Sequence, residues 1–272
     1  MAKGKVYLVG SGPGNPKLLT VRALELIRQA DVVVYDRLVS EEIMDLIPGN
    51  VRRIDVGKTP RDSVWNQGDI NSILLCEAID GNAVVRLKGG DPMLFSRGGE
   101  ETEALRSEEI DYEVVPGVSS ATGVPSYVGI PLTHRTLSSS VAFVTGHEDP
   151  RKFEPSVDYG KIASGVDSLV ILMGVATMRQ VAENLLRGGV PPLTPVAIIE
   201  RGTRPDQKVS FSSIERILEG HLNGQISSPA IIVVGEVVRL AKDYADEEEL
   251  LDLNLQRELM ESKTWCAAAE YS

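Results

Sequence analysis

The feature that most constrains the fold is a regular alternation between short apolar runs and segments with helical spacing of apolar residues. In the first half of the chain, each run rich in valine, isoleucine or leucine is followed by a segment whose apolar residues recur every three or four positions. This order favours parallel strands joined by crossover helices, because parallel neighbours need a long connection between them. The predicted strands are 6–9, 32–35, 51–56, 83–87 and 112–115, and the predicted helices are 18–29, 41–47, 70–79 and 100–106.

The second half repeats this alternation after a polar break at 131–140, whose sequence PLTHRTLSSS is typical of a linker. We therefore predict an α/β fold made of two α/β domains, an N-terminal one at 1–135 and a C-terminal one at 136–245. Residues 246–272 are predicted to form an acidic tail. In the second half, strands are predicted at 141–145, 169–172, 196–200, 208–211 and 230–234, with helices at 176–187, 212–219 and 236–244.

Negative charge is concentrated at one end of the chain. The sequence has 28 lysines and arginines against 39 aspartates and glutamates, a formal net charge of −11. Residues 246–272 hold eight of the acidic residues and two of the basic ones, so they contribute −6 and the rest of the chain −5. An acidic chain without a basic block disfavours nucleic acid as a partner.

The composition also narrows the cellular setting. There is no run of about 18 apolar residues, which argues against a membrane span, and we expect no membrane partner. The start MAKGKVYLVG lacks the apolar region of a secretory signal. The two cysteines, Cys76 and Cys266, do not have the spacing of a metal site or of a disulfide framework. We expect a cytoplasmic protein without a bound metal.

A glycine-rich loop, Gly10-Ser11-Gly12-Pro13-Gly14, directly follows the first predicted strand. Such a strand-to-helix turn lets the backbone approach a nucleotide closely. Asp36 follows Gly12 by 24 residues, which is near the spacing of the ribose-binding acid in dinucleotide-binding proteins. The full fingerprint of those proteins is absent, and Pro13 removes an N–H group that a phosphate could use. Two interpretations stay open, the nucleotide loop of an NAD(P)-dependent oxidoreductase and a tight turn only.

Further polar loops follow the later strands, where open α/β sheets bind their ligands. The string at 86–101, RLKGGDPMLFSRGGEE, combines backbone donors with an aspartate that can accept a hydrogen bond from a ribose hydroxyl. Ser119 and Ser120 are expected to open a helix, whose free N–H groups can hold a polar ligand or be capped by the serines. Met173 and Gly202 end two strands of the second half, where they could close over a cofactor. His147 is interpreted as a strand-end residue.

Together these strings resemble the tetrapyrrole methylases. Eight strings occur in the order of that family, over roughly residues 4–240. They are GSGPGNPKLLT, VVVYDRLVS, VGK, RLKGGDPMLFSRGGEE, VPGVSSATGVPSYVGIPLTHR, TGHE, MGV and IERGT. The RLKGGDP…RGGEE and GIPLTHR strings are the most specific of them. Two departures are small, since Ser96 stands where glycine is commoner and Ser119-Ser120 where Thr-Ala is commoner.

The resemblance implies a site between the two domains that binds S-adenosyl-L-methionine and releases S-adenosyl-L-homocysteine. Asp36 matches the family's proposed proton acceptor, Lys58 its proposed proton donor and Arg97 a substrate-site arginine. Carried over residue by residue, the cofactor contacts are Pro13, Gly89, Gly90, Asp91, Leu94, Ser119, Ser120, Met173 and Gly202.

The resemblance also implies a reaction and a homodimer. Family members with these strings methylate uroporphyrinogen III at carbons 2 and 7, through precorrin-1, to give precorrin-2 for sirohaem and cobalamin biosynthesis. Because the substrate carries eight carboxylates, we expect a basic cleft, with Arg37, His134 and Arg135 as substrate-binding residues beside Lys58 and Arg97. The alternatives are a related precorrin methylase, an NAD(P)-dependent oxidoreductase and a non-catalytic cofactor-binding module.

Overall fold

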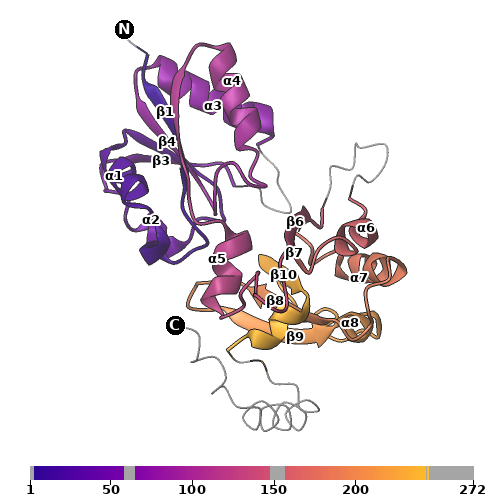
Figure 1. The fold of residues 1–272 in the computed structure, drawn as a ribbon. Coiled ribbons are helices and arrows are strands. Elements are labelled where there is room, and N and C mark those ends of the chain that lie inside the picture. Colours follow the sequence, from indigo (N-terminus) through magenta and orange to yellow (C-terminus); the bar gives the residue numbers. More distant parts are fainter. Residues whose placement is uncertain (1–2, 58–64, 148–156, 243, 245–272) are drawn as a thin grey trace, which may run out of the picture.

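The structure, a computed structural model, describes residues 3–57, 65–147, 157–242 and 244. Its strands form two five-stranded sheets that lie at separate ends of the molecule (Figure 1). The predicted α/β fold is therefore confirmed. Lys58 and the predicted tail at 246–272 lie outside the described residues. In the described part of the chain, no helix is both long enough and apolar enough to cross a membrane.

The first sheet is entirely parallel, as the alternation predicts. Its strand order is β3-β2-β4-β1-β5. Each strand begins and ends within one residue of its predicted bounds. The strands are β1 (Lys5–Gly10), β2 (Val32–Tyr35), β3 (Arg52–Asp55), β4 (Ala83–Lys88) and β5 (Asp111–Val115).

Both faces of the first sheet are covered by helices (Figure 1). Alternate strand residues point to opposite faces, so Val9 and Val33 pack against one pair of helices, whereas Leu8 and Val34 pack against the other. Burial on both faces explains why the inner strand β2 is a continuous apolar run, whereas the edge strand β3 is mostly polar and exposed. The first pair is α1 (Val21–Gln29) and α2 (Glu41–Met44), the second is α3 (Gln67–Ile79) and α4 (Gly98–Ser107), and a short 3-10 helix, η1 (Pro16–Leu18), precedes α1.

Local hydrogen bonds set where these helices begin and end. The Thr20 hydroxyl accepts the N–H of Ala23 at 3.1 Å, so α1 begins after residue 20 rather than at 18. Asn66 and Asp69 form a reciprocal capping box that starts α3 at Gln67 instead of 70. The N–H of Asp45 still bonds four residues back, but those of Leu46 and Ile47 bond three residues back, which ends α2 short of the predicted residue 47.

The second sheet is mixed, and only β6 and β7 run parallel in it. Its order is β6-β7-β10-β8-β9, with the other neighbours antiparallel. β8 and β9 pair antiparallel because the connection at 201–207 is short, whereas a parallel pair would need a longer crossover. The strands are β6 (Val141–Thr145), β7 (Ser168–Leu172), β8 (Pro195–Glu200), β9 (Lys208–Ser213) and β10 (Ala230–Val234).

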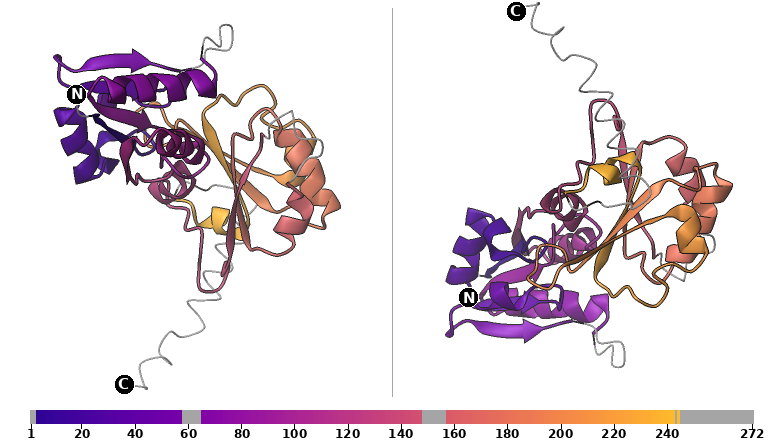
Figure 2. Two further views of the ribbon diagram at one scale, coloured as in Figure 1. Left: turned by 90° about the horizontal axis from the view of Figure 1, so that it is seen from above. Right: turned by 90° about the horizontal axis from the view of Figure 1, so that it is seen from below.

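Helices cover both faces of this sheet as well. Ala121 and Val124 of one helix, α5, are buried against Val170, Ile199 and Val233. α5 precedes the predicted linker in sequence, yet it packs on the second sheet and lies between the two halves (Figure 2). The domain boundary near residue 135 thus stays a prediction. The helices are α5 (Ser120–Tyr127), α6 (Tyr159–Ala163), α7 (Met178–Arg187), α8 (Ile214–Leu218) and a 3-10 helix, η2 (Glu236–Leu240), which is shorter than the helix predicted at 236–244.

Candidate active site

Three loops meet at the carboxyl ends of β1, β4 and β5, which are neighbours in the first sheet. A Cβ atom on Gly117 would lie 2.4 Å from the carbonyl oxygen of Gly90, and one on Gly10 would lie 2.6 Å from the Cα of Gly117. Gly12 and Gly90 exchange two backbone hydrogen bonds, of 3.1 and 2.8 Å. Only glycine permits backbones to approach this closely. The three loops therefore form one unit, which we name the loop platform.

Asp91 fastens the loop platform with its carboxylate. Oδ1 accepts the N–H of Met93 at 2.8 Å, and Oδ2 accepts the N–H of Gly117 at 3.1 Å. Asp91 also lines a large cavity, and each carboxylate oxygen can accept more than one hydrogen bond. The same side chain can therefore hold two loops together and bind a ligand hydroxyl.

The cavity that Asp91 lines is the larger of two in this region and has a volume of about 660 Å³. Its lining comes from loops at the carboxyl end of the first sheet, from the end of β7 and from the start of β10, so both halves of the chain contribute. Leu38, Phe95 and Met173 line it and are 48%, 39% and 50% exposed. Exposed apolar side chains around a cavity are typical of a ligand site. Of the predicted site residues, those that line it are Asp36, Gly89, Gly90, Asp91, Leu94, Arg97, Ser119, Ser120 and Met173.

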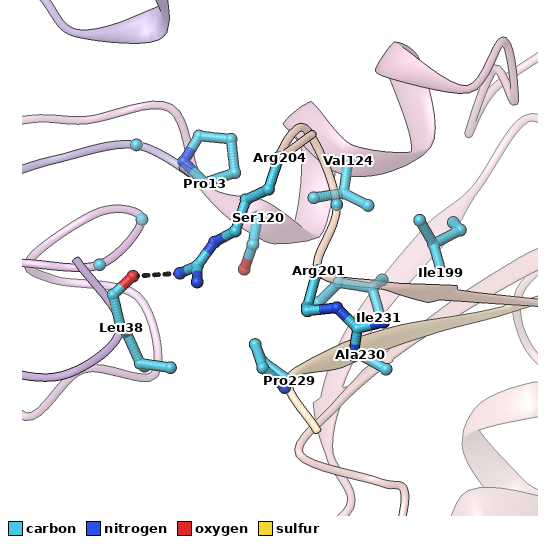
Figure 3. Close-up of a pocket in the computed structure, with 14 residues that line it drawn as sticks. Pro13, Leu38, Ser120, Val124, Ile199, Arg201, Arg204, Pro229, Ala230 and Ile231 are labelled. Atoms are coloured by element: carbon cyan, nitrogen blue, oxygen red, sulfur yellow. Dashed lines mark hydrogen bonds between the residues drawn. The ribbon is translucent and has the colours of Figure 1, made fainter. Parts of the chain in front are cut away.

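Figure 3 shows a smaller cavity, of about 100 Å³, which shares part of its lining with the larger one. Leu38, Ser120 and Ala230 are among the residues that line both. The two remaining predicted cofactor residues, Pro13 and Gly202, line the smaller cavity. All nine predicted cofactor residues thus converge on two adjoining cavities.

The basic residues that are predicted to bind the substrate do not all converge on the two cavities. Arg37 and Arg135 are exposed, and His134 lies in a turn closed by backbone hydrogen bonds with Ser138 of 2.7 and 3.0 Å. None of these three residues lines either cavity. Lys58 lies outside the described residues. The structure therefore brings Asp36 and Arg97 to the cavity with the predicted cofactor residues, and leaves the other substrate-binding residues as predictions.

A group of buried charges borders the larger cavity. Arg86 and Lys88 on β4 and Glu101 on α4 have side chains that are at most 4% exposed. Oε1 of Glu101 accepts from Lys88 Nζ at 2.8 Å and from Arg86 Nε at 3.2 Å. Arg86 Nη2 also lies 3.5 Å from Oδ2 of Asp36. We name Arg86, Lys88 and Glu101 the buried charge cluster.

Glu101 is the one anion within this cluster, and it faces two cations. Burial lowers the pKa of Lys88, the charge of Arg86 lowers it further, and Glu101 opposes both effects. Oε2 of Glu101 has no hydrogen-bond partner among the residues that the structure describes. The cluster in turn holds Asp36, whose Oδ1 accepts the N–H of Leu38 at 3.0 Å and whose side chain is 24% exposed. The Asp36 carboxylate is thus fixed in place at the cavity.

Uncommon backbone conformations gather around the two cavities. Phe95, Arg97, Met173 and Arg201 have φ angles of 53°, 62°, 57° and 46°, and each lines a cavity. A residue other than glycine in this left-handed region costs about 1–3 kcal/mol and persists only where its surroundings fix it, often at a functional site. The strain supports the assignment of these loops to the active site.

Several residues at the cavities are not singled out by the sequence patterns. Arg86 and Lys88 lie within RLKGGDP, and a signal for them exists: a strand buried on both faces is normally apolar, yet β4 places two charges on one face. Gln67 and His147 also line the larger cavity, and Arg204 the smaller. His147 lies two residues beyond the end of β6, and its interpretation as a strand-end residue stays a prediction.

Known proteins are similar to this chain in sequence and in fold. Residues 5–218 match the family described as Tetrapyrrole (Corrin/Porphyrin) Methylases. The chain belongs to the tetrapyrrole methylase family. The resemblance that the motifs predict is thereby confirmed, and the match includes the loop platform and the buried charge cluster of this tetrapyrrole methylase.

Relatives of this tetrapyrrole methylase include a protein of Methanosarcina barkeri (strain Fusaro / DSM 804) named S-adenosyl-L-methionine-dependent uroporphyrinogen III methyltransferase. It is 51% identical over 237 residues, which cover 87% of this chain and 93% of the relative. Siroheme synthase 1 of Pectobacterium atrosepticum is 46% identical over 244 residues, 90% of this chain but 50% of that protein. The chain therefore spans about half the length of that sirohaem synthase.

A solved structure has the same fold. Uroporphyrin-III C-methyl transferase from Thermus thermophilus, complexed with S-adenyl homocysteine, is 42% identical with a TM-score of 0.76, over 87% of this chain and 99% of that one. The native form of the same protein gives 40% identity and a TM-score of 0.76. Experimental structures thus support the fold of this tetrapyrrole methylase.

Proposed function

We propose that this chain transfers methyl groups from S-adenosyl-L-methionine to carbons 2 and 7 of uroporphyrinogen III, through precorrin-1. The products are precorrin-2, for sirohaem and cobalamin biosynthesis, and S-adenosyl-L-homocysteine. The observation that carries the proposal is the convergence of the predicted cofactor residues with Asp36 on two adjoining cavities. The name of the 51%-identical relative, which states this cofactor and substrate, supports it.

The cavities suit the cofactor in size and in chemistry. A volume of about 660 Å³ falls within the usual range for pockets that bury small molecules, roughly 300–1,000 Å³. Space is kept open at Gly89, where a Cβ atom would lie 2.8 Å from the Cβ of Leu38. Asp91 offers a carboxylate to hydroxyl groups, and Ser119 and Ser120 offer hydroxyls of their own. When bound, the cofactor supplies a methyl group that its sulfonium sulfur has already activated.

The contribution of the chain itself is alignment and charge. Holding donor and acceptor in line supplies much of the rate in a group transfer. Positive charge develops on the pyrrole ring as its carbon gains the new bond, and a proton must later leave the macrocycle. The Asp36 carboxylate, held by Arg86 and by the Leu38 N–H, can stabilise that charge and accept that proton.

The carboxylates of the substrate need cations at the cavity. Arg97 lines the larger cavity, is 45% exposed, and is paired through Nε with Glu100 at 2.9 Å. This pairing orients the guanidinium, and charge-assisted bonds from arginine suit a carboxylate well. We propose that Arg97 binds a substrate carboxylate and that Lys58, Arg37, His134 and Arg135 add positive charge on the substrate side.

Asp91→Ala is expected to weaken the binding of S-adenosyl-L-homocysteine by about 1–3 kcal/mol. The variant removes an acceptor for a ligand hydroxyl and also releases the N–H groups of Met93 and Gly117. Isothermal titration calorimetry measures the affinity. Asp31→Ala is the control, because Asp31 accepts the N–H of Ala83 at 2.8 Å away from both cavities. Unchanged affinity in Asp91→Ala would remove this residue from the cofactor site.

Arg97→Ala is expected to lower kcat/KM for uroporphyrinogen III by about 10- to 100-fold and to spare S-adenosyl-L-homocysteine affinity. The estimate corresponds to the loss of one hydrogen bond between charged groups. Initial rates at varied substrate concentration, together with calorimetry, separate the two effects. Arg106→Ala, in the last turn of α4, the helix that begins directly after Arg97, is the control. Wild-type kcat/KM in Arg97→Ala would mean that the arginine serves the structure only.

Ligand titration tests the cofactor assignment against the oxidoreductase alternative. S-adenosyl-L-homocysteine should bind the purified chain, and NADH should not. Tight binding of NADH without binding of S-adenosyl-L-homocysteine would contradict the proposed function. We also propose, on the family resemblance, that the chain works as a homodimer in the cytoplasm, and sedimentation equilibrium of the purified chain tests the dimer.

A further inference from the structure

The loop between β8 and β9 reaches across to the first half of the chain. Nη2 of Arg204 donates to the carbonyl oxygen of Leu38 at 2.5 Å, and Oγ1 of Thr203 accepts the N–H of Asn15 at 3.1 Å. Figure 3 shows the guanidinium of Arg204 next to Leu38, with Pro13 and Ser120 nearby, at the smaller cavity. This loop therefore forms part of the wall of that cavity.

The contact between this loop and the first half of the chain is close, and the backbone of the loop is strained near Arg204. A Cβ atom on Gly14 would lie 2.7 Å from Cγ of Arg204 and 2.9 Å from its Nε, so the arginine lies directly on the glycine. Arg201 and Thr203 have φ angles of 46° and 69°. A β-branched residue such as threonine rarely adopts this conformation, and such strain is concentrated at ligand sites.

One donor of Arg204 is left unused. Its Nε is buried and has no hydrogen-bond partner within the described part of the chain. A buried donor on a charged group is costly to leave unpaired, and the great majority of such atoms in proteins are paired. The other arginine at this cavity, Arg201, is already held by Asp206 at 2.7 Å. The unpaired N–H of Arg204 therefore indicates a missing acceptor.

The cavity that Arg204 lines is mostly apolar. Val124, Ile199 and Ile231 line the smaller cavity together with Ala230 and Pro229. A purine ring has flat apolar faces and acceptor nitrogens on its edge, so it matches an apolar lining with one donor. A buried carboxylate would need several donors to replace its water. The adenine of an S-adenosyl ligand is thus the better match for this end of the site.

We propose that Arg204 is a binding residue for the cofactor, with its Nε–H donating to a ring nitrogen of the adenine. The proposal rests on the proposed function, because it takes an S-adenosyl ligand as the occupant of the cavities. Arg204 then has two roles. Its Nη2 joins the two halves of the chain by donating to the Leu38 carbonyl, and its Nε–H donates to the adenine of the ligand.

Arg204→Lys separates these two roles. Lysine keeps the positive charge and can still donate to the Leu38 carbonyl, but it has no Nε–H group. Calorimetry measures the affinity for two probes, S-adenosyl-L-homocysteine and 5′-methylthioadenosine, which has the adenosyl half without the amino-acid half. We expect both affinities to fall about tenfold or more. Arg179→Lys is the control, because Arg179 also donates to a carbonyl, that of Leu218 at 2.7 Å, and lines neither cavity.

Each other outcome overturns the proposal in a distinct way. Unchanged affinities in Arg204→Lys would mean that the arginine only joins the two halves. A loss for S-adenosyl-L-homocysteine alone would place the donor at the amino-acid half. If the wild-type chain binds neither probe, the proposed function fails and this proposal fails with it. Arg204→Met, whose unbranched side chain has no N–H group, replaces the lysine variant if circular dichroism shows that the latter is not folded.

Discussion

Replacing Glu101 with glutamine is expected to lower the free energy of unfolding by about 3–5 kcal/mol. Glutamine has nearly the same shape, but it removes the anion that faces Arg86 and Lys88, whose side chains are at most 4% exposed. Among the described residues, the carboxylate then left to pair with this cluster is that of Asp36, 3.5 Å from Arg86. Urea denaturation followed by circular dichroism measures the loss.

Two further variants make this a test of charge rather than of packing. Lys88→Met removes one of the two cations, and since burial already lowers the pKa of Lys88, we expect a much smaller loss. Glu113→Gln breaks an exposed ion pair with Arg22 at 3.0 Å and should change the denaturation midpoint little. A loss for Lys88→Met as large as that for Glu101→Gln would contradict the role given to Glu101.

Asp36→Asn is expected to lower kcat by about 10²- to 10⁴-fold and to leave the affinity for S-adenosyl-L-homocysteine unchanged. Asparagine carries no negative charge to stabilise the pyrrole and cannot accept its proton. Its amide oxygen can still accept from the N–H of Leu38, so the side chain should stay in place. Single-turnover methylation under anaerobic conditions measures the chemical step.

Asp55→Asn is a matched control for this variant. Asp55 ends β3, which neighbours β2 in the first sheet, and its Oδ1 accepts the N–H of Gly57 at 2.7 Å, two residues ahead as in Asp36. It lines neither cavity, so Asp55→Asn should turn over at the wild-type rate. An equal loss in both variants, or wild-type turnover in Asp36→Asn, would contradict the role of Asp36.

The strands of this fold are predictable because burial on both faces leaves a clear mark in the sequence. The runs at 32–35 and 230–234 coincide with β2 and β10. The mixed order of the second sheet is not predictable in this way, because β10 pairs with β7 and β8 through contacts between distant parts of the chain. Helix ends depend on single hydrogen bonds, such as the one that Thr20 accepts.

The active site, too, has a part that the sequence predicts and a part that depends on tertiary contacts. The glycine strings locate the loop platform, because only glycine permits the close approach of Gly90 and Gly117. The buried charge cluster and Arg204 depend on tertiary contacts instead. Arg204 meets Leu38 across 166 residues, and no local pattern indicates that the two should pair. The residues that fix Asp36 and close the smaller cavity therefore become visible only in the folded chain.

Anaerobic incubation of the purified chain with uroporphyrinogen III and S-adenosyl-L-methionine tests the central claim most directly. Mass spectrometry follows the tetrapyrrole, and chromatography follows S-adenosyl-L-homocysteine. We predict a tetrapyrrole with two added methyl groups and two equivalents of S-adenosyl-L-homocysteine for each one formed. If a chain that binds S-adenosyl-L-homocysteine forms no dimethylated product in repeated assays, uroporphyrinogen III is not its substrate and the proposed function is wrong.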